Sequence, residues 1–135
     1  MGKAWKAFEQ EVADFFGGTR RVRINYSESI GDIIHPNYSI ECKYGGQVPL
    51  YLCPKAIVRL TSGGTKYWVV PSDKLYSQIC QFSPLGEFVI NRYKRVILFL
   101  DRAMNQARRY NPTLKSVVCV KKKNQRGFNC IWEAT

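Results

Sequence analysis

Long apolar runs, histidines and acidic residues are all scarce in this sequence, and each scarcity excludes a class of protein. The longest purely apolar run covers five residues, 96–100, whereas a membrane-spanning helix needs about 20. The first residues, which include Lys3 and Lys6, lack the uncharged apolar stretch of a signal peptide. We therefore expect an intracellular, cytoplasmic protein.

Metal-binding patterns built on cysteine and histidine are also missing. The five cysteines stand at irregular spacings without any Cys-x-x-Cys pair, and His35 is the only histidine. This combination argues against a zinc finger and favours cysteines that pack as small apolar side chains. A nucleophilic pair of Cys42 and His35 is conceivable, but nothing in the surrounding sequence marks one.

The shortage of acidic residues gives the chain a strong positive charge. Ten Asp and Glu residues face 21 Lys and Arg residues, for a net charge of +11. Residues 1–60 carry eight basic and six acidic residues, and residues 61–135 carry thirteen and four. Such a charge indicates a polyanionic partner, because each Lys or Arg that meets a phosphate releases bound counterions. The alternative is that the charge serves solubility alone.

The 135 residues form one domain with no repeat or linker, and apolar spacing and turn residues predict its elements. We expect helices over 3–16, 72–80 and 93–110, strands over 21–26, 32–34, 38–43 and 67–70, and a final hairpin of 114–120 with 128–132. This order predicts an α/β (α+β) fold in which a central mixed β-sheet is flanked by helices.

The residues that indicate chemistry lie in the hairpin at 32–43. Side chains alternate along a strand, so Glu41 and Lys43 should face one side and Ile40 and Cys42 the other. The turn at 35–37 can bring Asp32 beside Glu41, and two such carboxylates with room for water suit Mg²⁺ or Mn²⁺. Glu9 lies beside the apolar stripe of the first helix, where it either reaches over the sheet or remains at an exposed edge.

A helix glutamate, a strand aspartate and then Glu-x-Lys resemble the PD-(D/E)XK nuclease superfamily, and the single-domain length and late helix resemble archaeal-type and viral Holliday junction resolvases. Gly31 stands where the motif name expects proline. The resemblance covers residues 3–44 and, loosely, 93–133, and residues 45–92 are interpreted as a family-specific insertion. It implies a restriction-endonuclease-like fold and an Mg²⁺-dependent endonuclease of DNA recombination and repair that resolves four-way junctions by paired nicks as a homodimer.

Carried over by position, the resemblance implies that Glu9, Asp32 and Glu41 are catalytic metal ligands and that Lys43 is the catalytic lysine. Ser29 would be the loop serine near the scissile phosphate, although Ser27 competes for that role. Gln106 and Tyr110 match the Gln-x-x-x-Tyr pattern of RecB-type exonucleases, and they either touch the site or form an ordinary helix surface. The candidate DNA-binding residues are Arg20, Arg21, Arg23, Arg108, Arg109, Lys121, Lys122 and Lys123.

Two other functions stay open on the sequence alone. The Gln-x-x-x-Tyr match favours a RecB-like or single-strand DNA nuclease. A basic nucleic-acid-binding protein without catalysis would use the same carboxylates and lysine as ion pairs on a sheet face.

Overall fold

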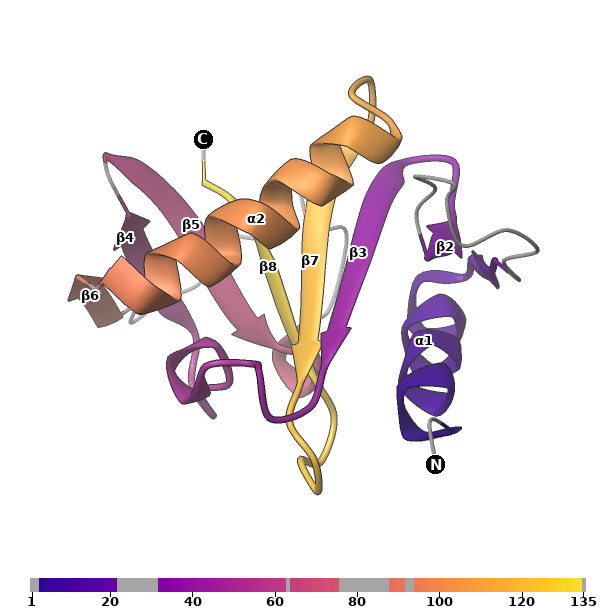
Figure 1. The fold of residues 1–135 in the computed structure, drawn as a ribbon, viewed down its shortest axis with the longest axis horizontal. Helices are drawn as coiled ribbons and strands as arrows, with labels where there is room; N and C mark the ends of the chain where they lie inside the picture. The colour runs from indigo at the N-terminus through magenta and orange to yellow at the C-terminus, as the bar shows by residue number, and fades with distance from the viewer. Residues whose placement is uncertain (1–2, 22–31, 63, 76–87, 92–93, 135) are drawn as a thin grey trace.

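The fold is built on one eight-stranded mixed sheet and two helices (Figure 1). The computed structural model describes residues 3–21, 32–62, 64–75, 88–91 and 94–134. The helices are α1 (Lys3–Phe16) and α2 (Lys94–Tyr110), and the strands are β1 (Thr19–Arg20), β2 (Ile33–Ile34), β3 (Tyr38–Tyr44), β4 (Val58–Ser62), β5 (Thr65–Pro71), β6 (Phe88–Asn91), β7 (Lys115–Lys121) and β8 (Asn129–Glu133). Short 3₁₀ turns cover Leu50–Leu52 and Ser72–Lys74. The predicted α+β class with a mixed sheet is confirmed.

The strand order is β1-β2-β3-β7-β8-β5-β4-β6. The pairs β3 with β7 and β4 with β6 are parallel, and the remaining neighbours are antiparallel. Strands β4, β5 and β6 come from the segment that the family resemblance left unassigned. They extend the same sheet, so this segment shares the core of the domain.

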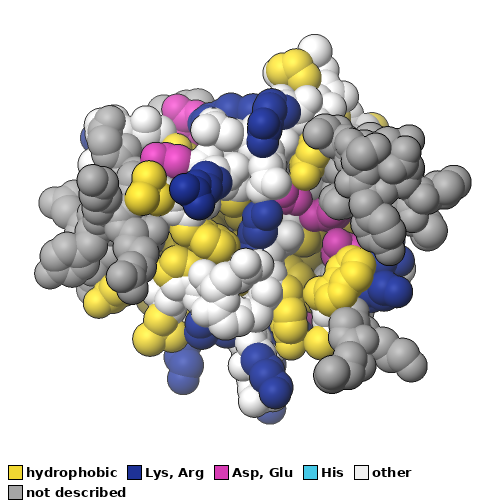
Figure 2. All heavy atoms as spheres, viewed as in Figure 1, with side chains coloured by type: hydrophobic (Ala, Val, Ile, Leu, Met, Phe, Trp, Pro, Cys, Tyr) yellow, Lys and Arg dark blue, Asp and Glu magenta, His cyan; other side chains and the backbone are white. Residues whose placement is uncertain are grey.

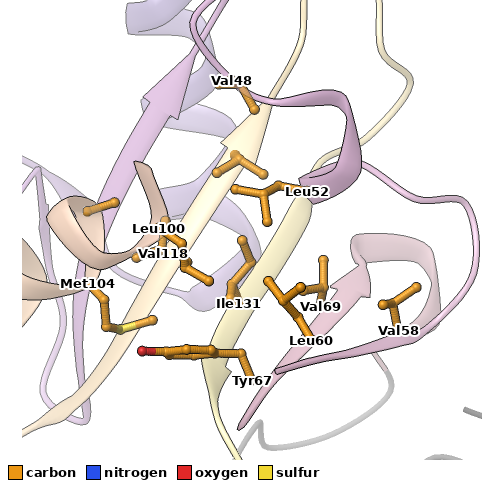
Figure 3. Close-up of a cluster of buried hydrophobic side chains, with 12 residues drawn as sticks. Val48, Leu52, Val58, Leu60, Tyr67, Val69, Leu100, Met104, Val118 and Ile131 are labelled. Carbon is orange, nitrogen blue, oxygen red and sulfur yellow. The ribbon is translucent and has the colours of Figure 1, made fainter. Parts of the chain in front are cut away.

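The two helices cover opposite faces of the sheet, as alternate residues of β7 show. Val118 and Val120 pack in one cluster with side chains of α2, whereas Val117 and Cys119 pack in a second cluster with side chains of α1. Figure 3 shows the first cluster, in which Leu100 of α2 lies over the strands. Two buried clusters on one sheet fix the position of each helix relative to β3.

Both helices end where sequence signals predict. Gly17 adopts a φ of +72°, and the Gly18 N–H donates to the Ala13 carbonyl at 2.8 Å, which closes α1 in a Schellman motif. At the end of α2, Asn111 accepts a hydrogen bond from the Thr113 N–H at 3.1 Å, and Pro112 stops the helix. The α2 terminus therefore stands at a defined place beside β3.

Some predicted elements differ from those observed. The strand expected over 21–26 is preceded by the two-residue strand β1 at Thr19–Arg20, and residues 22–26 lie outside the described part of the chain. The helix expected over 72–80 is a 3₁₀ turn over Ser72–Lys74, after which Leu75 is extended; residues 76–80 lie outside the described part. Pro71 fixes the start of this turn, and the Phe128 carbonyl accepts the Ser72 N–H across it, which holds the segment to the sheet. In the described ranges, no helix has the length and apolar character needed to cross a bilayer.

Candidate active site

A polar cavity of about 420 Å³ opens between α1, β2, β3 and the C-terminal end of α2. Its lining includes Glu9, Asp32, Glu41, Lys43, Gln106 and Tyr110, together with Trp5, Lys6, Arg20, Arg21 and Cys42. Residues from distant parts of the chain thus meet at one place. The candidate site residues from the sequence line one cavity: the three acidic residues, Lys43, and the pair Gln106 and Tyr110. Figure 2 shows acidic side chains gathered on this face, with Lys and Arg side chains beside them.

The β2–β3 hairpin brings the two strand carboxylates together. Ile33 pairs with Ile40 in an antiparallel register, which places Asp32 opposite Glu41. The Asp32 Oδ2 atom accepts a hydrogen bond from the Cys42 backbone N–H at 3.0 Å. Asp32 and Glu41 also share a side-chain hydrogen bond. The expected proximity of these two residues is therefore found, and the backbone of β3 holds Asp32 in place.

Glu41 lies on the face of β3 that looks toward α2. Ile40 and Cys42 pack in the cluster on the α1 face, as the strand alternation predicts. The Tyr110 hydroxyl donates to the Glu41 Oε2 atom at 3.1 Å, and the Lys43 Nζ atom lies 3.5 Å from the same oxygen. One oxygen of Glu41 thus faces a hydroxyl and an ammonium group.

The environment of Glu41 favours its protonated form. Burial raises its pKa from 4.5 to about 8, and the hydrogen bond and negative charge of Asp32 act in the same direction. The positive charge of Lys43 and the hydrogen bond from Tyr110 lower the pKa, but they offset only part of the increase. The side chain is 3% exposed, so water screens these interactions weakly. Below about pH 8, and with no cation beside it other than Lys43, the pair of Asp32 and Glu41 therefore holds a proton.

The carboxylate of Glu9 is directed toward an arginine in the same cavity. The Arg20 Nε atom donates to the Glu9 Oε1 atom at 2.8 Å, and the guanidinium lies 5.7 Å from the centre of the Trp5 ring. Glu9 is buried, so of the two positions that the sequence left open the structure has the inward one and not the exposed helix edge. Its role as a metal ligand stays a prediction, because its carboxylate is paired with Arg20.

The carboxyl groups of the cavity meet part of what a divalent metal ion needs. Within the described ranges, no three His, Cys, Asp or Glu side chains are grouped so that they could hold a metal ion. Asp32 and Glu41 nevertheless supply two adjacent carboxyl groups with an open polar cavity beside them. Mg²⁺ commonly uses one or two carboxylates and retains several waters. Lys43 offsets the negative charge of this carboxyl pair only in part, so the residues present fit such an ion.

Two cavity residues, Trp5 and Lys6, were not among the candidates from the sequence. Trp5 belongs to the apolar stripe of the first helix, yet it is 42% exposed and lines the cavity, where the Lys6 ammonium lies 5.6 Å from its ring centre. A usable signal was present, since Trp5 precedes Glu9 by four residues and therefore shares its helix face. Lys6 and Trp5 add a positive charge and an aromatic edge to the site.

The predicted DNA-binding residues divide into several groups. Arg20 and Arg21 line the cavity, and Arg108 and Arg109 line a larger groove next to it. Arg108 also forms an ion pair with Glu133, with its Nη2 atom at 3.0 Å from Oε2. Arg23, as well as Ser27 and Ser29, lies outside the described residues.

The three consecutive lysines lie at the end of β7, in and after the last strand residue. Lys121 forms an ion pair with Glu11 at 2.8 Å, and the Lys122 ammonium donates to the Val48 carbonyl at 2.6 Å. Lys123 is exposed. Two of these lysines therefore stabilise the fold locally, and the DNA contact predicted for all three stays a prediction.

We compared the chain with protein-family models, curated proteins and solved structures, and nothing matches.

Proposed function

We propose that this protein is a divalent-metal-dependent, structure-selective DNA endonuclease with a restriction-endonuclease-like fold, and that its substrate is a four-way DNA junction. The observation that carries the proposal is the meeting of Asp32, Glu41 and Lys43, with Glu9, in one polar cavity. This is the residue set of the PD-(D/E)XK nucleases, which the sequence resembles. The net charge of +11 agrees with a polyanionic substrate.

Asp32 and Glu41 are the residues that would hold Mg²⁺ or Mn²⁺, with Glu9 as a third ligand once its carboxylate leaves Arg20. The ion supplies Lewis-acid stabilisation of the charge that develops on the phosphate oxygens. Tyr110 fixes one oxygen of Glu41, and the Cys42 N–H fixes one oxygen of Asp32. The carboxyl groups are thereby oriented before the substrate arrives.

Lys43 and the arginines act on the phosphate. The Lys43 Nζ atom lies beside Glu41 at the cavity wall, where its positive charge can stabilise a phosphate oxygen in the transition state. Arg20, Arg21 and Lys6 line the opposite part of the cavity and bind the backbone without reading bases. Paired symmetric nicks require two such sites, so we propose a homodimer in the cell.

The test is cleavage of a synthetic four-way junction labelled on each strand in turn. We expect symmetric nicks with Mg²⁺, and losses of about 100-fold or more in single-turnover rate for Asp32→Asn and Lys43→Ala, since such charge-stabilising groups contribute several kcal/mol. Lys66→Ala is the matched control, because Lys66 is exposed, lies outside the cavity and is not a candidate DNA-binding residue. Binding is measured separately in Ca²⁺.

Wild-type rates in both cavity variants would remove the nuclease assignment from these residues. Salt-sensitive binding by the wild type without turnover in Mg²⁺ or Mn²⁺ would favour the non-catalytic nucleic-acid-binding protein.

One observation favours a second candidate, a RecB-like or single-strand DNA nuclease. Gln106 and Tyr110 both line the cavity, and Tyr110 contacts Glu41 directly. A preference for DNA ends or single strands over junctions, with activity reduced by Gln106→Ala, would support this candidate over the first.

A further inference from the structure

A second, larger groove of about 890 Å³ adjoins the candidate active site. Lys43 and Gln106 line both hollows, so the groove and the cavity adjoin at these two side chains. Its wall is the surface of α2 from Leu98 to Arg109, and Gln47 contributes from the segment that follows β3. A polymer that passes through the cavity therefore has an open path along α2.

The α2 wall presents one helical face with two kinds of side chain. Leu98, Arg102, Gln106 and Arg109 recur at spacings of three and four residues, so they lie in a row along the helix. Leu98 is 45% exposed, and together with Phe99 it gives the groove an apolar floor.

Cations border this floor. Arg102 and Arg109 are exposed, and neither forms an ion pair with another residue in the described part of the chain. The described lining contains no acidic side chain. Figure 2 shows the same face, where apolar side chains lie between Lys and Arg side chains. The groove thus attracts anionic groups at its rim and apolar groups at its floor.

We propose that this groove binds an unpaired DNA strand that extends from the scissile phosphate. This proposal rests on the proposed nuclease function, and it narrows the substrate to branched DNA with a single-stranded arm. A paired duplex offers phosphates at its surface but keeps its bases stacked. An unpaired strand offers phosphates to Arg102 and Arg109 and exposed base faces to Leu98 and Phe99, which matches both parts of the groove.

The test measures binding without turnover. Fluorescence anisotropy in EDTA compares a labelled single strand of about 15 nucleotides, which covers a usual single-strand site, with a blunt duplex of equal length. The double variant Arg102→Glu/Arg109→Glu should weaken single-strand binding about tenfold or more. It should also lower the log–log salt slope by roughly 1.4, since each phosphate that an arginine neutralises adds about 0.7 to the slope.

Two further variants complete the design. Lys66→Glu makes the same change of charge sign at an exposed position that lies outside the groove and is not a candidate DNA-binding residue, and we expect a much smaller effect from it. Leu98→Ser tests the floor, and it should weaken the single strand while it leaves duplex affinity unchanged. The three groove substitutions, at Leu98, Arg102 and Arg109, are all at exposed positions, and circular dichroism checks that the variants fold.

The outcomes separate the two proposals. Equal losses in Lys66→Glu and the double groove variant, or equal losses for duplex and single strand, would overturn the groove assignment even if the wild type cleaves junctions. If the groove variants selectively lose single-strand binding and the wild type cleaves no DNA, the proposed role of the groove stands and the proposed nuclease function is rejected. A preference for flapped over fully paired junctions that disappears in the groove variants would support both.

Discussion

The buried carboxyl of Glu41 makes the stability of the metal-free protein depend on pH in a defined direction. The perturbation is Glu41→Gln, which keeps the shape and hydrogen-bonding capacity of a protonated glutamic acid but cannot ionise. Its amide can donate to Asp32 and its oxygen can accept from Tyr110, as the carboxyl group does. The comparison of wild type and variant therefore isolates the titration of one group.

The sign follows from the raised pKa. Burial and Asp32 raise the pKa of Glu41 from 4.5 to about 8, so the folded state holds a proton that the unfolded state loses above pH 4.5. The contribution to stability is complete below pH 4.5 and is lost as pH rises through about 8. The loss is about 1.4 kcal/mol per pH unit, which over this window amounts to a difference on the order of 5 kcal/mol.

The assay is urea unfolding in EDTA at about one-unit steps from pH 5 to pH 10, followed by circular dichroism. The free energy of unfolding of the wild type should fall relative to Glu41→Gln across this series and should level off above about pH 8. Glu133→Gln is the control, because Glu133 is exposed and pairs with Arg108 at the surface. Parallel curves for the wild type and Glu41→Gln would refute the reasoning.

Three further predictions concern Tyr110, the binding of Mg²⁺ and the glycine Gly18, for which Gly46 is the control. Tyr110→Phe removes a hydrogen bond that lowers the pKa of Glu41, so this pKa should rise further. The measurement is the difference in the free energy of unfolding between Tyr110→Phe and the double variant Tyr110→Phe/Glu41→Gln. This difference should be lost at a higher pH than the difference between the wild type and Glu41→Gln. Mg²⁺ binding below pH 8 should release up to one proton, measured by calorimetry in two buffers of different ionisation enthalpy. Gly18→Ala should destabilise the fold by about 1–3 kcal/mol, because an added Cβ would lie 2.7 Å from the Ile34 carbonyl oxygen. Gly46→Ala, where nothing lies within 4 Å, should change the free energy of unfolding by less than about 0.5 kcal/mol.

Elements set by local signals were predictable from the sequence. The spacing of Phe8 and Val12 and the following glycines predicted helix α1 with its observed bounds. The turn at 35–37 predicted the β2–β3 pair, and with it the proximity of Asp32 and Glu41. These features depend on residues close together in the chain, where periodicity and turn chemistry carry the information.

The strands that pair over long distances were not predictable. Val58 to Ser62 alternates as a strand should, but its parallel partner β6 begins 30 residues after β4 begins, and no spacing rule selects that pair. Strand β8 lies between β7 and β5, so the last strand in the chain occupies the middle of the sheet. Such placements depend on the burial of whole faces, which a single sequence does not reveal.

The site itself was predictable as a set of residues but not as an electrostatic arrangement. Strand alternation and family resemblance placed Glu9, Asp32, Glu41 and Lys43 together. Neither could predict that Arg20 would bind Glu9, because this contact depends on how the turn after α1 places Arg20 beside the helix. Repulsion between the two adjacent carboxylates does predict that one pKa rises, but not that Glu41 is the residue concerned or that burial by the assembled fold is the main cause.

Under the proposed function, this electrostatic arrangement would make cation and DNA binding depend on each other. Three acidic side chains at the cavity would repel a phosphate, yet Glu9 is neutralised by Arg20 and Glu41 retains a proton near neutral pH. The cavity therefore carries less negative charge than its composition suggests, and a phosphate can approach along the basic rim. Under the proposed function, a divalent cation held by Asp32 and Glu41 would replace the proton and attract the phosphate, and the phosphate would draw Arg20 away from Glu9. Each ligand thus removes an electrostatic cost for the other, and we expect Mg²⁺ affinity to increase when DNA is bound.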